Sequence, residues 1–300
     1  MNQELNSCVA TVGFFDGVHA GHRFLIDELK AIAKAQNLKS VVITFATHPR
    51  KVLDAAFKPE LLNTLSEKVT LLKSTGVDSC IMLDFTPEMA KLSAYEFIKT
   101  VLCEKYHVST LLVGHDHRFG HNRTDGFAEY KKYGESLGMN VIQEKCYSTS
   151  EFTIISSSEV RLALLRGEIE TANKMLTYHY SIQGKVMNGF KIGRKIGFPT
   201  ANLSPNDPEK IVPAHGVYAV RVHWNQQVYK GMMNIGTRPT LENGLHTSLE
   251  VHILDFDQDI YNQTIEIEFI QKIRDEQKFN GVEALIEQLK KDKQEVLAIL

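Results

Sequence analysis

Two histidines and several glycines lie close together near the start of the chain. The segment Gly13–His22 reads Gly-Phe-Phe-Asp-Gly-Val-His-Ala-Gly-His, between a short apolar run and a helical pattern. The start of a helix presents unpaired N–H groups and partial positive charge, which favour an anion. His19 and His22 would donate hydrogen bonds to phosphate oxygens, so we expect a nucleotide-phosphate site in this turn. The glycines that would let the backbone approach the ligand are Gly13, Gly17 and Gly21.

A metal site is the alternative interpretation of His19 and His22. Zinc sites in proteins are usually completed by further cysteine, histidine or carboxylate ligands. Asp16 is the single nearby candidate of those types in this segment. The pattern therefore favours an anion over a metal ion.

A second polar segment, Ile155–Arg161, reads Ile-Ser-Ser-Ser-Glu-Val-Arg at the predicted start of a helix. Ser158 and Arg161 are three residues apart, so on a helix their side chains share a face and can contact one phosphate. The serines alone are typical of a helix N-cap, and the arginine alone of a solvated surface. Their occurrence in one domain with the histidine turn favours the phosphate-binding interpretation.

A third segment, Gly189–Asn202, is a basic, glycine-rich loop that leads into an extended stretch. Such a loop can fold over phosphate groups, although a solvated loop explains the same composition. Thr200 and Asn202 are two residues apart, so in an extended chain they share a face and can hold a phosphate-bound Mg²⁺. The P-loop pattern is absent from the sequence, which excludes a P-loop kinase. The glycines and cations of the loop are Gly189, Lys191, Gly193, Arg194, Lys195 and Gly197.

Composition narrows the class of protein. A length of 300 residues suits two domains, and a net charge of −2 gives no basic surface for a nucleic-acid polymer. No pattern in the sequence specifies an oligomeric state. No apolar segment is long enough to cross a membrane, and no secretion signal precedes the first strand. We therefore predict a cytoplasmic protein with reduced thiols. The cysteines, none of them in a Cys-x-x-Cys pair, are Cys8, Cys80, Cys103 and Cys146.

The first half of the chain alternates predicted strands with predicted helices. This alternation is typical of a parallel sheet covered by helices, in which ligands bind beyond the carboxyl ends of the strands. The turns at His19, at His48 and over 114–120 fall at such ends and are expected to line one cleft. We expect Ser66 to cap the second helix. The expected strands are 8–14, 40–45, 79–83, 109–113 and 140–144, and the expected helices are 21–36, 66–74, 93–106 and 126–137.

Beyond about residue 180 the pattern changes to strands followed by one amphipathic helix. The spacing of these strands predicts a small antiparallel barrel or sandwich, so we expect domains over 1–180 and 181–300. Alternation along 264–270 predicts a half-buried strand with Glu266 and Glu268 in solvent. The expected strands are 216–224, 228–235, 247–254 and 264–270, and the expected helix is 282–300.

These motifs together resemble a known family. Gly13–His22 is similar to the His-x-Gly-His signature of the nucleotidyltransferase superfamily, and Ile155–Arg161 is similar to its Ser/Thr-x-x-Arg partner. Over nearly its full length the chain resembles the bacterial bifunctional riboflavin kinase/FMN adenylyltransferases. The resemblance implies a Rossmann-like nucleotidyltransferase domain and a riboflavin kinase β-barrel. Further matching segments are Thr44–Arg50, Val113–Gly120 with Arg123, Gly197–Asn202, Asn234–Thr240 and Leu249–Phe256.

The resemblance also implies roles for individual residues, with ATP, riboflavin and FMN as substrates and Mg²⁺ as cofactor. Glu250 is implied as the catalytic base of the kinase, and Thr200 and Asn202 as the holders of Mg²⁺–nucleotide. The implied adenylyltransferase residues are His19, His22, Ser158 and Arg161. Further implied nucleotide- and flavin-binding residues are Gly13, Phe14, Asp16, Gly17, Gly21, Asp116, Ser157, Gly193, Arg194, Gly197 and Arg274.

The sequence departs from the family pattern at four positions. Phe14 stands where many members carry asparagine, and Thr47 replaces a proline. His117 replaces a phenylalanine, and Asn262 replaces a glycine. These changes leave two alternatives: a riboflavin kinase with an impaired adenylyltransferase site, and a flavin sensor with inactive sites. A class I tRNA synthetase also uses a His-x-Gly-His turn, but its Lys-Met-Ser-Lys-Ser motif is absent here.

Overall fold

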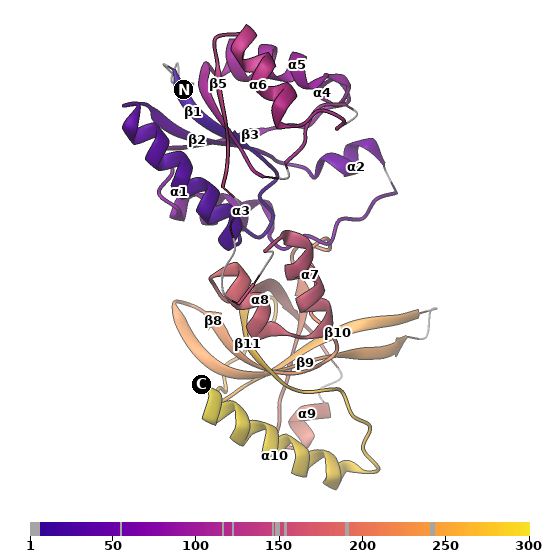
Figure 1. Cartoon of the computed structure of the whole chain (residues 1–300). Coiled ribbons are helices and arrows are strands. Elements are labelled where there is room, and N and C mark those ends of the chain that lie inside the picture. The colour runs from indigo at the N-terminus through magenta and orange to yellow at the C-terminus, as the bar shows by residue number, and fades with distance from the viewer. Residues whose placement is uncertain are drawn as a thin grey trace. The chain divides into compact units, whose positions relative to one another are not determined.

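The structure is a computed structural model that forms two compact units, residues 1–157 and 158–300 (Figure 1). Two residues with an expected role, Asp116 and Lys191, lie outside the described part of the chain, as does Cys146. For residues 192, 238–240 and 244–246 the backbone alone is described. The described residues are 7–54, 56–115, 117–121, 123–145, 147, 151–152, 155–189, 192–240 and 244–300.

The first unit is built on a parallel sheet, as the alternation of strands and helices predicts. In the described residues the strand order is β3-β2-β1-β4-β5. The chain builds outward from β1 through β2 to β3 and then returns to place β4 on the other side of β1. The crevice between the carboxyl ends of β1 and β4 is where such sheets bind ligands. The strands are β1 (Cys8–Val12), β2 (Lys39–Phe45), β3 (Ser79–Leu83), β4 (Val108–Val113) and β5 (Asn140–Gln143).

Helices cover both faces of this sheet. Ile26 and Leu29 of the first helix pack on Val42 and Leu112 on one face, and a separate apolar cluster that includes Leu111 fills the other. The expected helix over 93–106 is a short α-helix continued by a π-helix. The helices are α1 (Ala20–Ala35), α2 (Pro49–Leu53), α3 (Leu65–Ser74), α4 (Pro87–Lys91), α5 (Ala94–Glu96), η1 (Phe97–Lys105) and α6 (Phe127–Ser136).

The expected N-cap of α3 is wrong by two residues. Thr64, not Ser66, accepts the backbone N–H of Glu67, and the Glu67 carboxylate accepts the Thr64 N–H in return. A threonine followed three residues later by a glutamate satisfies two unpaired helix donors at once. This reciprocal capping box fixes the start of α3.

The second unit contains a closed antiparallel barrel. Of the two folds that the strand spacing predicts, a barrel or a sandwich, the structure therefore has the barrel. Its strand order is β10-β7-β6-β11-β8-β9. The elements β6, β7, α8 and α9 are additions to those expected from the sequence. The strands are β6 (Ser181–Met187), β7 (Ala201–Pro205), β8 (Gly216–Trp224), β9 (Gln227–Thr240), β10 (Gly244–Ile253) and β11 (Thr264–Arg274). The helices are α7 (Ser157–Arg166), α8 (Ile169–Leu176), α9 (Ile192–Lys195) and α10 (Val282–Ile299).

The barrel wall is buried on two sides where α10 covers it. Along β8, Val220 and Val222 alternate with Val217 and Ala219, and all four are buried. Val217 and Ala219 pack with Val296 of α10, so the other two face the barrel interior. An outer apolar layer therefore lies between the barrel wall and α10.

The division between the two units falls earlier in the chain than the expected boundary near residue 180. Asn173 of α8 donates to the carbonyl oxygen of Phe269 in β11 (2.9 Å) and accepts the N–H of Tyr180 (2.8 Å). The N–H of Ala214 donates to the carbonyl oxygen of Leu164 in α7 (3.0 Å). These bonds attach α7 and α8 to the barrel.

Candidate functional site

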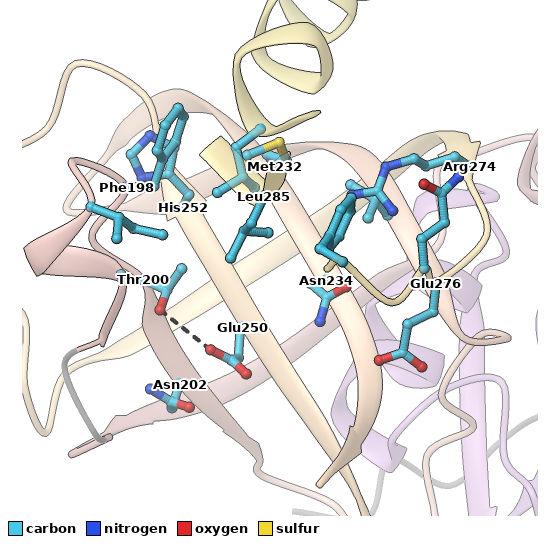
Figure 2. A pocket seen from close by; sticks show the side chains of 16 residues that line it. Phe198, Thr200, Asn202, Met232, Asn234, Glu250, His252, Arg274, Glu276 and Leu285 are labelled. Atoms are coloured by element: carbon cyan, nitrogen blue, oxygen red, sulfur yellow. Dashed lines mark hydrogen bonds between the residues drawn. The ribbon is translucent and has the colours of Figure 1, made fainter. Parts of the chain in front are cut away.

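A row of polar side chains crosses three neighbouring strands of the barrel. Glu250 of β10 lies directly opposite Asn202 of β7 on one side and Asn234 of β9 on the other. Asn234 in turn lies opposite Val217, and Val217 lies opposite Arg274. Opposite residues of antiparallel strands share a face, so the pairing register brings these residues to one side of the barrel wall. They are Asn202, Val217, Asn234, Glu250 and Arg274. They line a cavity of about 400 Å³ (Figure 2).

Glu250 points into this cavity together with Thr200. The Thr200 hydroxyl donates to Oε2 of Glu250 over 3.4 Å, the dashed line in Figure 2. Leu249 and Val251, the neighbours of Glu250, are buried on the opposite face of β10, as the alternation predicts. The structure thus brings together Thr200, Asn202 and Glu250, three residues that the sequence places up to fifty positions apart.

The remaining walls of the cavity are largely apolar. Phe198, Met232 and Leu285 line it, and α10 supplies part of the wall (Figure 2). His252 also lines it, with Nδ1 2.7 Å from the carbonyl oxygen of Pro199. A carbonyl only accepts, so Nδ1 carries the proton. Burial lowers the pKa of His252, so the ring is neutral near pH 7 and adds shape rather than charge.

A second cavity, of about 490 Å³, lies beside the first in the barrel unit. Its lining includes Arg194, Phe256 and Tyr261. Thr200 lines both cavities. Thr200 therefore lies where the two cavities are nearest in the sequence of the barrel wall.

The loop that leads to Thr200 turns at two of the expected glycines. Gly193 accepts the N–H groups of Ile196 and Phe198 at 3.2 and 2.9 Å, and it lines the first cavity. Gly197 has φ of +82°, in the left-handed region that favours glycine. The loop therefore directs Gly193 and Arg194 toward different cavities.

Arg274 lies at the edge of the first cavity, but its guanidinium group is engaged by α10. Nε and one terminal nitrogen donate to the buried carboxylate of Asp292 over 2.7–3.1 Å. Such a forked pair fixes both groups in direction as well as distance. The pair holds α10 over the barrel, and a direct flavin contact by Arg274 stays a prediction.

In the first unit, His19 and His22 lie at the start of α1, as predicted. His19 is the N-cap, and its Nδ1 accepts the backbone N–H of His22 over 3.4 Å. The two rings stack with centroids 3.7 Å apart. Burial lowers the pKa of His22 well below its usual range, and the neighbouring His19 lowers it further. Both imidazoles are therefore presented as a pair at the end of β1.

The polar atoms around this pair are not all satisfied within the protein. Among the described residues, Nδ1 of His22 and Nε of Arg23 are shielded from solvent and have no hydrogen-bond partner. Buried polar atoms are nearly always paired, so such exceptions need an explanation. A bound ligand would provide one.

Asp16 and Phe14 shape the turn through the backbone. The Asp16 carboxylate accepts the N–H groups of Leu62 and Asn63 over 3.0–3.2 Å and is buried. The Phe14 carbonyl oxygen accepts a hydrogen bond from Lys68 (3.1 Å). Within the turn, Gly17 has φ of +83°, and a Cβ on Gly13 would lie 2.9 Å from the ring of Phe15. A Cβ on Gly21 would lie 3.3 Å from the ring of His19.

Lys68 is a site residue that sequence reasoning missed. Its ammonium group donates to the carbonyl oxygens of Phe14 and Phe45, at the carboxyl ends of β1 and β2. Burial lowers the pKa of Lys68 to about 8. A helical lysine usually indicates a solvated position, so the sequence offers no signal for this role.

The segment with Ser158 and Arg161 forms the first turns of α7. The Ser157 hydroxyl, still within the first unit, donates to the carbonyl oxygen of Asp16 over 2.8 Å. Ser158 and Arg161 belong to the second unit. Their contact with the phosphates therefore stays a prediction.

Two family models match consecutive parts of the chain. The model of the FAD synthetases matches residues 1–159, and the model of the riboflavin kinases matches residues 176–300. The chain belongs to the bifunctional riboflavin kinase/FMN adenylyltransferase family. This confirms the family suggested by the motifs, and the barrel can now be called the riboflavin kinase module.

Relatives and a solved structure extend the match to nearly the full length. The bifunctional riboflavin kinase/FMN adenylyltransferase of Listeria monocytogenes is 38% identical and covers 97% of this chain and 91% of its own. That of Haemophilus influenzae is 37% identical, covering 97% of this chain and 94% of its own. A crystal structure from Streptococcus pneumoniae described as a macrolide-efflux protein has a TM-score of 0.87 at 33% identity, covering 96% and 93% of the two chains. The description as an efflux protein applies to the Streptococcus pneumoniae protein and is not transferred to this chain.

No helix in the described ranges has the length and apolar character required to span a membrane.

Two further residues of the kinase module are placed by contacts between distant segments. Asn234 reaches the Glu250 row through the β9–β10 register, and Asp292 reaches Arg274 through the packing of α10. The motif around Asn234 was recognised, but nothing local indicates which of its residues faces the cavity.

Proposed function

We propose that this chain performs the two reactions of its family in succession, at the sites described above. The riboflavin kinase module transfers the γ-phosphoryl group of ATP to the 5′-hydroxyl of riboflavin and forms FMN. The first unit then joins FMN to the AMP part of ATP and releases pyrophosphate, which gives FAD. The observation that carries the proposal is the row of Asn202, Glu250 and Asn234 facing the first cavity.

In the kinase step, riboflavin occupies the first cavity and ATP the second. The apolar walls formed by Phe198, Met232 and Leu285 suit a flavin ring. Glu250 takes the proton from the attacking hydroxyl, since a carboxylate within hydrogen-bond reach orients and activates that group. Thr200 lines both cavities, which puts the transferred group next to Glu250. Positioning and charge stabilisation supply most of the catalysis in such a transfer.

We propose Mg²⁺ as the cofactor of this step. Thr200, Asn202 and Glu250 bring hydroxyl, amide and carboxylate oxygens to one cavity. Mg²⁺ prefers oxygen ligands and usually takes one or two from the protein and the rest from phosphates and water. The residues fit the ion. When bound, it supplies charge neutralisation on the phosphate oxygens.

In the adenylyltransferase step, a phosphate oxygen of FMN attacks the α-phosphorus of ATP, and the bond to pyrophosphate breaks. His19 accepts a backbone N–H at Nδ1, so its neutral ring carries the proton at Nε2 and can donate it to a phosphate oxygen. His22 and Arg161 add further donors to the charge that develops on the leaving group. Ser158 binds the phosphate through its hydroxyl. The stacked pair of imidazoles supports this assignment.

One experiment separates this function from its alternatives. The protein is incubated with riboflavin and Mg-ATP, and the flavins are then resolved by chromatography. FAD supports the two-step function. FMN alone would show an impaired adenylyltransferase site, and unchanged riboflavin would show a sensor. The family match does not favour either alternative.

We also propose a cytoplasmic location, from the state of the cysteines and the need for ATP. Cys8, Cys80 and Cys103 are free thiols. Free thiols and a requirement for ATP are typical of the cytoplasm, where we place the enzyme. Separating cell fractions and measuring FAD formation in each tests the assignment.

A further inference from the structure

The loop after β4 is held firmly against the first unit. The ring of Phe119 stacks on the buried ring of Tyr130 with centroids 4.2 Å apart. The Tyr130 hydroxyl accepts the Phe119 N–H over 2.9 Å and donates to backbone carbonyl oxygens of the loop. Gly120, with φ of +92°, lies so close to Ala94 that a Cβ there would be 2.6 Å from its nitrogen. The loop therefore holds His117 in a defined place.

His117 and Glu144 flank Gly114 at the carboxyl ends of β4 and β5. A Cβ on Gly114 would lie 3.6 Å from Oε2 of Glu144 and 3.6 Å from Cβ of His117. The backbone N–H of Glu144 donates to the carbonyl oxygen of Val113 over 2.8 Å, which fixes Glu144 beside the end of β4. The end of β4 adjoins the end of β1, where the histidine pair lies, and β5 is the next strand beyond β4.

Both side chains carry a polar atom that the protein leaves unpaired. In the described part of the chain, Nε2 of His117 and Oε1 of Glu144 are shielded from water and have no hydrogen-bond partner. Each such atom costs stability in the unliganded protein, so their placement side by side needs compensation. A ligand with a donor and an acceptor on one edge would pair both.

The charges of the two groups indicate the class of ligand. Burial, with a smaller contribution from Arg123, lowers the pKa of His117 to about 4, so the ring is neutral at pH 7. Burial and then Glu28 raise the pKa of Glu144 to about 7, although the His115 N–H lowers it. A neutral imidazole attracts a phosphate only weakly, and a carboxylate repels it. An uncharged heterocycle suits the pair better.

We propose that His117 and Glu144 hydrogen-bond the polar edge of a substrate N-heterocycle in the adenylyltransferase site. Adenine and the isoalloxazine ring both present ring nitrogens beside amino, N–H or carbonyl groups, so either can pair with one donor and one acceptor. The inference rests on the proposed adenylyl transfer. His117 and Glu144 act in it as binding residues, since neither has a role in the bond that breaks.

The test uses His117→Phe and Glu144→Met in the full chain, with FMN and ATP as substrates. Each change keeps the approximate size of the side chain and removes the unpaired atom. Glu144→Met also removes the oxygen that accepts the His115 N–H. KM for the heterocycle bound here should rise about tenfold, the effect of about 1.4 kcal/mol. A rise in KM for ATP identifies adenine, and a rise in KM for FMN identifies isoalloxazine. Riboflavin phosphorylation should stay unchanged, and the melting temperature of His117→Phe without ligand should not fall.

His121→Phe is the matched control in the same loop. Nδ1 of His121 lies 3.0 Å from the carbonyl oxygen of Ala90 and is already paired. This change should lower the melting temperature and leave both KM values as they are. Unchanged KM values in His117→Phe and Glu144→Met, or a lower melting temperature as their only effect, would overturn the inference. Wild-type protein that makes no FAD from FMN would instead overturn the proposed function.

Discussion

Asn202 of β7 lies directly opposite Glu250 of β10, and the two side chains share one face of the barrel wall. Thr200, two residues before Asn202, donates to the Glu250 carboxylate from the same side. The pairing register of two strands thus brings the candidate metal ligands and the candidate base into one cavity of about 400 Å³. A shift of one residue in that register would turn Glu250 to the opposite face.

Replacement of Glu250 should separate the two reactions. Glu250→Gln keeps the size of the side chain and removes the base, so FMN formation should fall by about 10²- to 10⁴-fold. Conversion of added FMN to FAD should continue at the wild-type rate. Both rates are measured by chromatography of the flavins. A loss of both activities in a folded variant would contradict the two-site assignment.

Replacement of His22 should have the reverse effect. His22→Ala removes one donor to the phosphate groups, which commonly costs about 10²- to 10³-fold in rate. FAD formation from FMN and ATP should fall by this amount, while riboflavin phosphorylation stays intact. Kinetics of the two half-reactions in separate assays check this. Equal FAD formation in the variant and the wild type would exclude a role for His22.

Lys68 should make stability depend on pH in the alkaline range. Burial lowers its pKa from 10.5 to about 8, so the unfolded chain binds this proton more tightly than the folded protein does. The free energy of unfolding of the wild type, relative to Lys68→Met, should therefore rise as the pH increases from about 8 to 10.5. Below about pH 8 Lys68 is protonated in both the folded and the unfolded chain, so the destabilisation from burying its charge is fully present.

Urea unfolding across this pH range measures the difference. Lys73→Met is the matched control, because Lys73 lies on the same helix and is exposed. The control should show the same difference from wild type at every pH. A constant difference for Lys68→Met as well would mean that its ammonium group pays no cost for burial.

Glu268 should stabilise the barrel unit through three basic neighbours. Its carboxylate lies 2.6 Å from His179, 3.1 Å from Arg221 and 2.6 Å from His223. Burial alone would raise the pKa of Glu268, but the bond from His223 and the nearby charges lower it overall. Glu268→Gln should therefore reduce the free energy of unfolding by about 1–2 kcal/mol at pH 7. The difference should vanish as the pH falls below 4.5, the ordinary pKa of the group.

Glu266→Gln is the control for Glu268. Glu266 lies on the same face of β11, two residues earlier, opposite His223. Its replacement should change stability by no more than about 0.5 kcal/mol. Thermal unfolding of both variants in the full chain gives the comparison, and equal losses would show that the cluster around Glu268 adds nothing specific.

Glu268 also shows where sequence reasoning stops. Alternation along β11 correctly predicts that Ile265, Ile267 and Phe269 are buried. The same pattern predicts a solvated Glu268, which is wrong, because its side chain is only 16% exposed. Its neighbours come from the α8–β6 connection and from β8, and local spacing carries no information on them.

The sequence by itself determined the order of most elements, the two-module organisation and the motif residues from His19 to Glu250. Periodicity and turn chemistry are local, so they can be deduced from neighbouring residues. The tertiary structure decided the closed barrel, the Asn234 and Asp292 contacts, and the burial of Lys68. These depend on strand register and helix packing between distant segments, and the free energy that selects them comes from burying side chains together.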